Sequence, residues 1–381
     1  MRITVDDGLA AWRDTVSTFM AEEIGVEYCR ERYQNRAYPH ALYDAVVENG
    51  WIGTAIPTEY GGQGGDQVEL AVLLEALGTY GYDFSMPVLT TATVSDLVLE
   101  FGTEEQKERF LPSVIDGERR FSIGVTEPET GSDAASIQTR ADRIEDGYRV
   151  DGEKIYQSGA QAPGNVIGCY VRTDPDAGRE GLSVLLIPND LEGVEVTKLP
   201  LVVRKAVGTA QVFFDEVTVP EDHLVGDEGA GWSLLEHHLV REHTHIAAAM
   251  VGNAQTAVDT ALDQATDRER FGQPVADFQA IGHRLADLQT EVDAARLLVY
   301  RSASALDAND GSRRLAAQAK LKAGEVLEEA SRAGMQILGG AGFFPENDME
   351  RYWREGKSAT VAGATSEIQR SVISAAMRDG A

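Results

Sequence analysis

The segments Thr126-Glu127-Pro128-Glu129-Thr130-Gly131-Ser132-Asp133 and Thr365-Ser366-Glu367-Ile368-Gln369-Arg370 decide the fold of this chain. The first follows an apolar run over 121–125 and is a Pro- and Gly-broken loop that carries hydroxyls and carboxylates. The second is typical of a helix start with a Ser or Thr cap. Alone, each predicts only a turn or a cap, so the meaning of the pair depends on the elements around it.

Hydrophobic periodicity divides the chain into three parts. Up to about residue 120, apolar residues recur three and four apart, which predicts helices, and Thr103 with Gln106 predicts a capping box. From 121 to 228 the β-rich runs 166–171, 182–187 and 212–214 alternate with Gly, Asp and Pro. From 229 onward the pattern predicts helices at 232–262, 275–308, 313–338 and 365–378.

The expected fold is therefore α+β and multidomain. We expect an N-terminal α-helical domain over 1–120, a middle β domain (a barrel or sandwich) over 121–228, and a C-terminal four-helix bundle over 229–381. The glycine-rich stretches 226–231 and 339–342 are not a G-x-G-x-x-G placed after a strand, which argues against a Rossmann fold.

The charge balance is strongly acidic, with 62 Asp and Glu against 34 Lys and Arg and a net charge of −28. The acidic residues are spread along the chain, so they predict a solvated surface that repels nucleic acid and anionic membranes. Scarce lysine beside dispersed carboxylates indicates a halophilic protein, and an ordinary acidic enzyme is the alternative.

The remaining composition predicts a cytoplasmic protein. Cys29 and Cys169 lie far apart without a partner motif, which argues against a disulfide framework or a thiolate metal site. No apolar run is long enough for a transmembrane helix, and residues 1–7 lack the apolar core of a signal peptide.

The paired motifs and the segment order resemble the acyl-CoA dehydrogenase family over essentially the whole chain. Three further stretches agree in order: 51–62, 101–112 and 336–342. The resemblance implies FAD as cofactor, an acyl-CoA substrate, an electron-transfer flavoprotein as partner and a homotetramer built as a dimer of dimers. It implies α,β-dehydrogenation to the trans-2-enoyl-CoA, in fatty-acid or branched-chain amino-acid breakdown.

The resemblance also assigns cofactor-binding roles. Tyr156 would flank the flavin ring in place of the usual Trp, and the Ser158 hydroxyl would bond flavin N5. Gly339 and Gly340 would let the pyrophosphate approach closely because glycine lacks a Cβ. The other implied cofactor-binding residues are Val125, Thr126, Ser132, Gln157, Arg268, Arg270, Phe271, Gln279, Gln336, Thr365 and Glu367.

The catalytic base is missing from its usual place in the family, because Gly363 stands where many members carry glutamate. Isovaleryl- and long-chain acyl-CoA dehydrogenases place the base on the first bundle helix, and Glu242 aligns with that position. The resemblance also implies substrate contacts from Ser132, Ala362, Gly363 and His243, where His243 replaces the usual Arg. The small Ala362 and Gly363 predict tolerance of methyl-branched or bulky acyl groups.

Three alternatives stay open. Glu242 and His245 have the E-x-x-H spacing of di-iron bundles, but no second such pair occurs, so we expect no metal. The chain is otherwise a non-catalytic or heteromeric subunit of this fold, or a flavin oxidase. Glycine at 363 favours the non-catalytic subunit, and an intact Glu242 opposes it.

Overall fold

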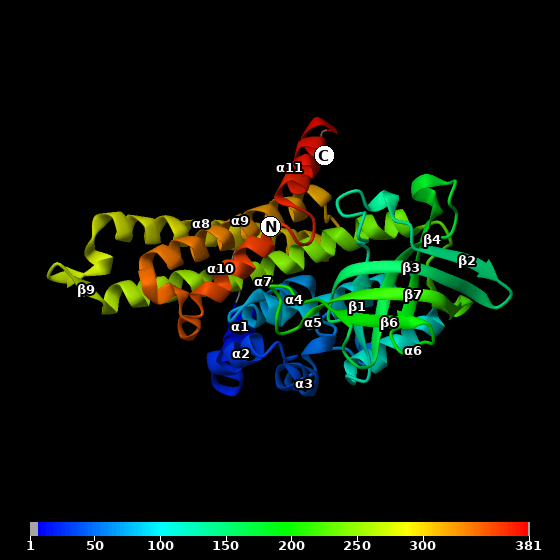
Figure 1. Cartoon of the computed structure of the whole chain (residues 1–381), viewed down its shortest axis with the longest axis horizontal. Helices are drawn as coiled ribbons and strands as arrows, with labels where there is room; N and C mark the ends of the chain where they lie inside the picture. Colours follow the sequence, from blue (N-terminus) through cyan, green and yellow to red (C-terminus); the bar gives the residue numbers. More distant parts are fainter. Residues whose placement is uncertain (1–6, 380–381) are drawn as a thin grey trace. The chain divides into compact units, whose positions relative to one another are not determined.

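The computed structural model describes residues 7–379, so residues 1–6, on which the absence of a signal peptide was argued, lie outside the described part together with 380 and 381. The chain forms two compact units whose elements are drawn in Figure 1. We call residues 1–35, 67–85 and 240–381 the bundle unit, and residues 36–66 and 86–239 the sheet unit.

Within the described residues, the sheet unit holds an eight-stranded mixed sheet. Its order is β6-β7-β3-β2-β4-β5-β8, and β1 pairs in parallel with β4 beside this path. The strands are β1 (Arg120–Gly124), β2 (Arg140–Ile144), β3 (Gly147–Ser158), β4 (Asn165–Arg172), β5 (Leu182–Pro188), β6 (Val194–Lys198), β7 (Thr209–Pro220) and β8 (Leu224–Val225).

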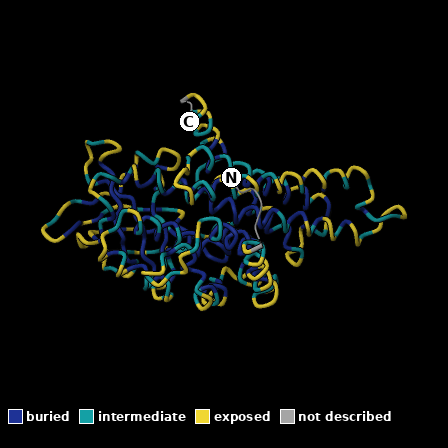
Figure 2. The backbone as a smooth tube through the Cα atoms, turned by 180° about the vertical axis from the view of Figure 1, so that it is seen from behind, coloured by how far each residue is buried: buried dark blue, intermediate teal, exposed yellow. Residues whose placement is uncertain are grey.

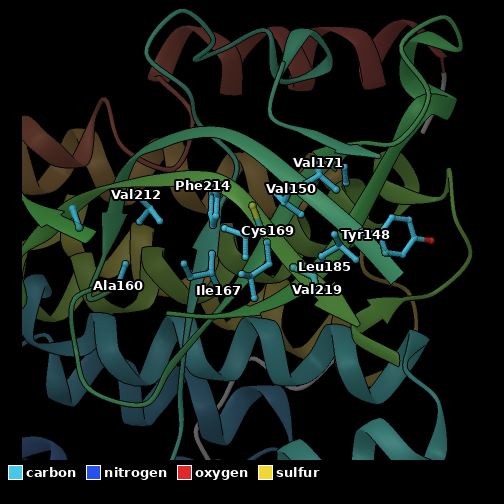
Figure 3. Close-up of a cluster of buried hydrophobic side chains, with 14 residues drawn as sticks. Tyr148, Val150, Ala160, Ile167, Cys169, Val171, Leu185, Val212, Phe214 and Val219 are labelled. Atoms are coloured by element: carbon cyan, nitrogen blue, oxygen red, sulfur yellow. The ribbon is translucent and has the colours of Figure 1, made fainter. Parts of the chain in front are cut away.

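The core of this unit is built around two strands that are buried along their whole length. β4 and β5 are buried at every residue, which explains their continuous apolar runs. Figure 3 shows side chains of these strands, such as Ile167 and Leu185, packed with Val212 and Phe214 of β7. Helices α3 (His40–Glu48), α5 (Met86–Phe101) and α6 (Glu104–Ile115) complete the unit.

Several local predictions are confirmed in this unit. The backbone N–H of Gln106 donates to Thr103 Oγ1 at 3.2 Å, and the Thr103 N–H donates to Gln106 Oε1 at 3.0 Å, so the capping box forms. The three predicted strands are β4, β5 and part of β7. β2, β3 and β6 were not predicted, because the prediction relied on continuous β-rich apolar runs and these strands alternate charged with apolar residues.

The bundle unit is helical. Its elements are α1 (Asp7–Phe19), a π-helical turn (Met20–Ile24), α2 (Gly25–Gln34), α4 (Gln67–Leu77), α7 (Gly231–Asp267) from Val240 onward, β9 (Glu269–Arg270), β10 (Gln273–Pro274), α8 (Gln279–Asp307), α9 (Arg313–Leu338), α10 (Met349–Ala359) and α11 (Ser366–Asp379). Figure 2 colours each residue by its burial and shows buried residues recurring along these helices between intermediate and exposed ones.

The predicted succession of helical, β and helical segments is confirmed, and the four predicted C-terminal helices correspond to α7, α8, α9 and α11. α10 was not predicted, because it is short and rich in charged residues although Met349 and Tyr352 are buried. No helix in residues 7–379 is long and apolar enough to cross a membrane.

Candidate functional site

A turn between α10 and α11 carries the position where the family usually has its base. Gly363 has φ +61° and Ala364 has φ +63°, so two successive residues adopt the left-handed conformation. Glycine takes this conformation freely, whereas an L-residue with a Cβ is disfavoured by roughly 1–2 kcal/mol. The backbone of this turn therefore favours glycine at 363 over glutamate.

The Glu242 carboxylate lies beside this turn within the bundle unit. A Cβ added at Gly363 would stand 3.8 Å from Glu242 Oε1 and 3.7 Å from Ile246 Cδ1. Glu242 is half-buried on α7 and is followed by a buried stretch over 243–254. A helical glutamate thus places its carboxylate next to the space that a side chain at 363 would enter.

His243 and Gln369 support the turn from within the bundle unit. Both are buried, and the Gln369 amide nitrogen lies 3.3 Å from His243 Nε2. The same nitrogen donates to the carbonyl oxygen of Gly363 at 3.2 Å. His243, predicted to contact substrate, is therefore linked to the turn through Gln369, while Ala362 is half-buried in the turn itself.

Lys320 on α9 was not among the predicted site residues. It is 1% exposed, and its Nζ donates to the carbonyl oxygen of Ala364 at 2.6 Å. A Cβ at Gly363 would also lie 3.9 Å from Lys320 Cε. One feature of the sequence could have indicated a buried lysine here. Lys320 stands among alanines of a predicted helix, and these alanines are buried: Ala316, Ala317, Ala319 and Ala323.

In the sheet unit, a buried ion pair fixes the loop that follows β1. Lys154 Nζ donates to Glu127 Oε1 at 2.8 Å and to the Val125 carbonyl at 3.1 Å, while the Thr126 carbonyl accepts from the Ile155 N–H. The Glu127 carboxylate also accepts the backbone N–H groups of 138 and 139. Burial raises the pKa of Glu127, but the Lys154 charge and these hydrogen bonds outweigh it and hold the pKa below its ordinary value.

The end of β3 presents an aromatic ring and a hydroxyl. Tyr156 has φ +64° within a register shift of β3 against β7, and it is 57% exposed. Ser158 is buried, and its Oγ accepts a hydrogen bond from Arg204 Nη1 at 2.6 Å. The Gln157 side chain is instead buried near Gly124, so any cofactor contact from Gln157 falls to its backbone.

The cofactor residues predicted in the bundle unit lie at two places. Arg268 donates to the carbonyls of Ile337 and Leu338, which brings it to the end of α9 beside Gly339 and Gly340. Thr365 Oγ1 accepts the Ile368 N–H at 3.3 Å, which confirms the predicted cap of α11. Exposed predicted residues are Arg270, Phe271, Gln279, Gln336 and Glu367, and in the sheet unit Ser132.

The histidines near Glu242 have separate partners. His237 Nε2 lies 2.8 Å from Asp96 Oδ2, and His238 Nδ1 lies 2.9 Å from the Tyr170 hydroxyl. Over residues 7–379, no three or more His, Cys, Asp or Glu side chains are grouped as metal ligands.

The predicted residues present groups that suit FAD. An open aromatic ring at Tyr156 and the hydroxyls of Thr126 and Ser158 suit a planar heteroaromatic ring. A Cβ at Gly339 or Gly340 would meet nothing within 4 Å, so the backbone there is open to the close approach of a phosphate.

Comparisons with known proteins agree over most of the described chain. Three family models match in order: "Acyl-CoA dehydrogenase, N-terminal domain" over residues 7–118, "middle domain" over 122–217 and "C-terminal domain" over 229–378. The probable acyl-CoA dehydrogenase YngJ of Bacillus subtilis is 35% identical over 366 residues, which cover 95% of each chain.

Two other proteins extend this picture. CarC, a subunit of the caffeyl-CoA reductase-Etf complex of Acetobacterium woodii, is 31% identical, with 95% of this chain and 96% of CarC covered. The solved structure of butyryl-CoA dehydrogenase from Megasphaera elsdenii has a TM-score of 0.94 at 27% identity and covers 99% of this chain and 100% of that one. With three matched domains and relatives of this similarity, the chain belongs to the acyl-CoA dehydrogenase family and is an oxidoreductase that uses FAD.

Proposed function

We propose that this enzyme oxidises the Cα–Cβ bond of an acyl-CoA thioester to the trans-2-enoyl-CoA, with Glu242 as the base. The observation that carries the proposal is the placement of Glu242 Oε1, 3.8 Å from the position of a Cβ at Gly363. A carboxylate on α7 thus lies beside the point from which the usual base of the family would project.

Each chemical task has a residue suited to it. The Glu242 carboxylate takes the α-proton, and charge then develops on the thioester oxygen. The Gly363 N–H makes no hydrogen bond within residues 7–379, so it is available to donate to that oxygen. FAD, when bound, supplies the acceptor for the hydrogen that leaves the β-carbon with its electron pair. Tyr156 and Ser158 would hold the flavin ring in position.

We propose electron-transfer flavoprotein as the electron acceptor. CarC, which is similar to this chain over nearly its full length, is named as a subunit of a reductase-Etf complex. The acyl group is not fixed by this similarity. Ala362 and Gly363 are small, half-buried residues, and their small size supports tolerance of methyl-branched acyl groups.

We also propose a homotetramer that works in the cytoplasm of a halophile. Phe271, Phe343 and Phe344 are 97%, 73% and 61% exposed in the bundle unit, and exposed aromatic side chains of this size support a subunit interface. Cys29 and Cys169 are buried free thiols, as is common in reducing compartments. The net charge of −28 supports adaptation to salt.

Anaerobic mixing with isovaleryl-, butyryl-, octanoyl- and palmitoyl-CoA tests the proposal, with bleaching of the flavin absorbance as readout. Glu242→Gln should reduce the rate by about 10²- to 10⁴-fold with FAD still bound. Glu236→Gln, the same change on the same helix, is the control and should retain the wild-type rate. Unchanged turnover in Glu242→Gln would assign the base elsewhere.

The same proteins, assayed both without oxygen and in air, separate the alternative functions. A non-catalytic subunit bleaches with none of the substrates unless a second chain is added. A flavin oxidase bleaches but is reoxidised by dioxygen at every turnover, so it consumes oxygen in step with substrate. The proposed dehydrogenase instead needs electron-transfer flavoprotein or an artificial acceptor for turnover.

A further inference from the structure

The turn at Gly363 and Ala364 requires support from the rest of the bundle unit. Ala364 is a non-glycine residue at φ +63°, a conformation that persists only where the surroundings hold it. Within the turn, the Val361 and Ala362 N–H groups donate to Ser358 O, and the Ser366 N–H donates to Thr360 O. These backbone bonds leave the carbonyls of Gly363 and Ala364 to other partners.

Two side chains from different helices donate hydrogen bonds to these carbonyls. Gln369 of α11 donates to the Gly363 carbonyl at 3.2 Å, and Lys320 of α9 donates to the Ala364 carbonyl at 2.6 Å. Together they hold two successive carbonyls of the turn. The Gly363 N–H then keeps a fixed direction, which a donor to a developing oxyanion requires.

Burying the Lys320 ammonium group costs desolvation free energy, and packing alone does not explain why a lysine stands there. It is 1% exposed in a helix face lined by alanine, where an apolar residue would avoid the desolvation of an ammonium group. Its Cε and the Glu242 Oε1 each lie within 4 Å of the same point, the Cβ position of Gly363. A buried cation and the proposed base therefore flank one residue.

We propose that Lys320 is a positioning residue for the dehydrogenation. It holds the Ala364 carbonyl so that the Gly363 N–H points at the thioester oxygen. Its positive charge also favours the negative charge that forms on that oxygen as Glu242 takes the α-proton. This inference rests on the proposed function and adds a residue to its machinery.

Three substitutions separate the hydrogen bond from the charge. Lys320→Met removes both, Lys320→Gln keeps a donor without the charge, and Lys320→Arg keeps both. Lys322→Met is the matched control, because Lys322 lies two residues further along α9, pairs with Glu291 and is only half-buried. Melting temperature and FAD content of every variant identify those that fold.

Proton abstraction is measured with an acyl-CoA analogue that has sulfur in place of carbon 3. Such a thioester loses its α-proton but has no β-hydrogen to give, so a long-wavelength absorbance band reports the enolate beside the flavin. In Lys320→Met we expect the rate of band formation to fall about 10- to 100-fold, with the analogue Kd changed less than threefold. Lys320→Arg should recover most of the rate and Lys320→Gln only part of it.

Hydrogen–deuterium exchange gives a readout that does not depend on activity. Peptides that cover 360–369 should exchange at least ~10-fold faster in Lys320→Met than in wild type, with normal exchange in Lys320→Arg and Lys322→Met. Wild-type exchange in Lys320→Met, or a rate within twofold of wild type, would overturn the assignment. The assignment would also be overturned if Lys320→Met and Lys320→Arg lost the same amount of rate and each lost FAD in proportion. That result would show that Lys320 has a structural role alone. If the wild-type protein bleaches with no acyl-CoA, the proposed function fails, and the exchange data still decide whether Lys320 holds the turn.

Discussion

Moving the base from α7 to the turn is the sharpest test of how Glu242 and Gly363 are related. The variant pair is Glu242→Ala with Gly363→Glu. A Cβ at 363 would meet Ile246, Glu242 and Lys320 atoms at 3.7–3.9 Å, which are ordinary contact distances. The new Cβ therefore enters without a clash, and we expect the carboxylate beyond it to use the space that the Glu242 carboxylate leaves.

The expected magnitude follows from the backbone. Glu242→Ala alone should lower the rate of flavin reduction by about 10²- to 10⁴-fold. Returning a carboxylate at φ +61° requires an L-residue in the left-handed region, at a cost of roughly 1–2 kcal/mol. We take this cost to reduce the population of the conformation in which residue 363 keeps a positive φ and its carboxylate faces the substrate. The double variant should then be about 5- to 30-fold slower than wild type and clearly faster than Glu242→Ala.

Anaerobic stopped-flow reduction of the flavin measures each variant, and calorimetry follows the melting temperature. Gly363→Ala is the control, because it carries the backbone cost without a carboxylate. It should lose up to about 2–4 °C of melting temperature per kcal/mol, and any slowing that it shows measures the part of the double variant's slowing that comes from the backbone. A double variant no faster than Glu242→Ala, in a protein where Gly363→Ala is fully active, would refute the view that the two positions serve one space.

Three further predictions concern the sheet unit and the surface. Arg204→Met should lower the midpoint potential of bound FAD, because a cation that donates to Ser158 Oγ favours a reduced, more negative flavin. Spectroelectrochemistry measures this potential. An unchanged potential with normal FAD content would show that the Arg204 charge does not act on the flavin. The lowered pKa of Glu127 means that its contribution to stability is present above its ordinary value of 4.5 and is lost as pH falls through the folded-state pKa. Glu127→Gln should therefore cost about 3 kcal/mol at pH 7, seen in denaturant unfolding, and the difference from wild type should shrink below about pH 4; a constant difference would contradict this. Melting temperature should rise with KCl up to molar concentration, where the Debye length is about 3 Å, and a flat response would count against a halophilic origin.

Most of the fold could be predicted from local pattern. The predicted strands 166–171 and 182–187 correspond to β4 and β5, because a strand buried on both faces is a continuous apolar run. β3 alternates apolar residues with Arg149, Asp151 and Glu153, and its length is set by pairing with β2 and β7. Such pairing depends on distant residues, so the local pattern gave no comparable signal.

The site divides in the same way. Glu242 could be proposed because a resemblance supplied the position, but its distance from Gly363 depends on how α7 packs against the turn before α11. Lys320 and Gln369 donate hydrogen bonds to backbone carbonyls. Every residue has such a carbonyl, so no sequence motif predicts these two contacts. A buried lysine in an alanine face was the available signal, and burial is a property of the folded chain. The left-handed conformation of Ala364 and Tyr156 is likewise imposed by tertiary context.

Glycine at 363 and glutamate on α7 are best understood as two parts of one arrangement. The turn already holds Ala364 at φ +63°, and a side chain at 363 would add a second residue with the same cost of roughly 1–2 kcal/mol. A base on α7 avoids that cost, because a helix fixes the carboxylate with an unstrained backbone. In the proposed reaction, the turn would then serve the other requirement, a backbone N–H directed at the thioester oxygen. On this argument, the absence of glutamate from the C-terminal motif does not indicate an inactive chain, since the carboxylate lies beside the turn and the turn keeps its donor.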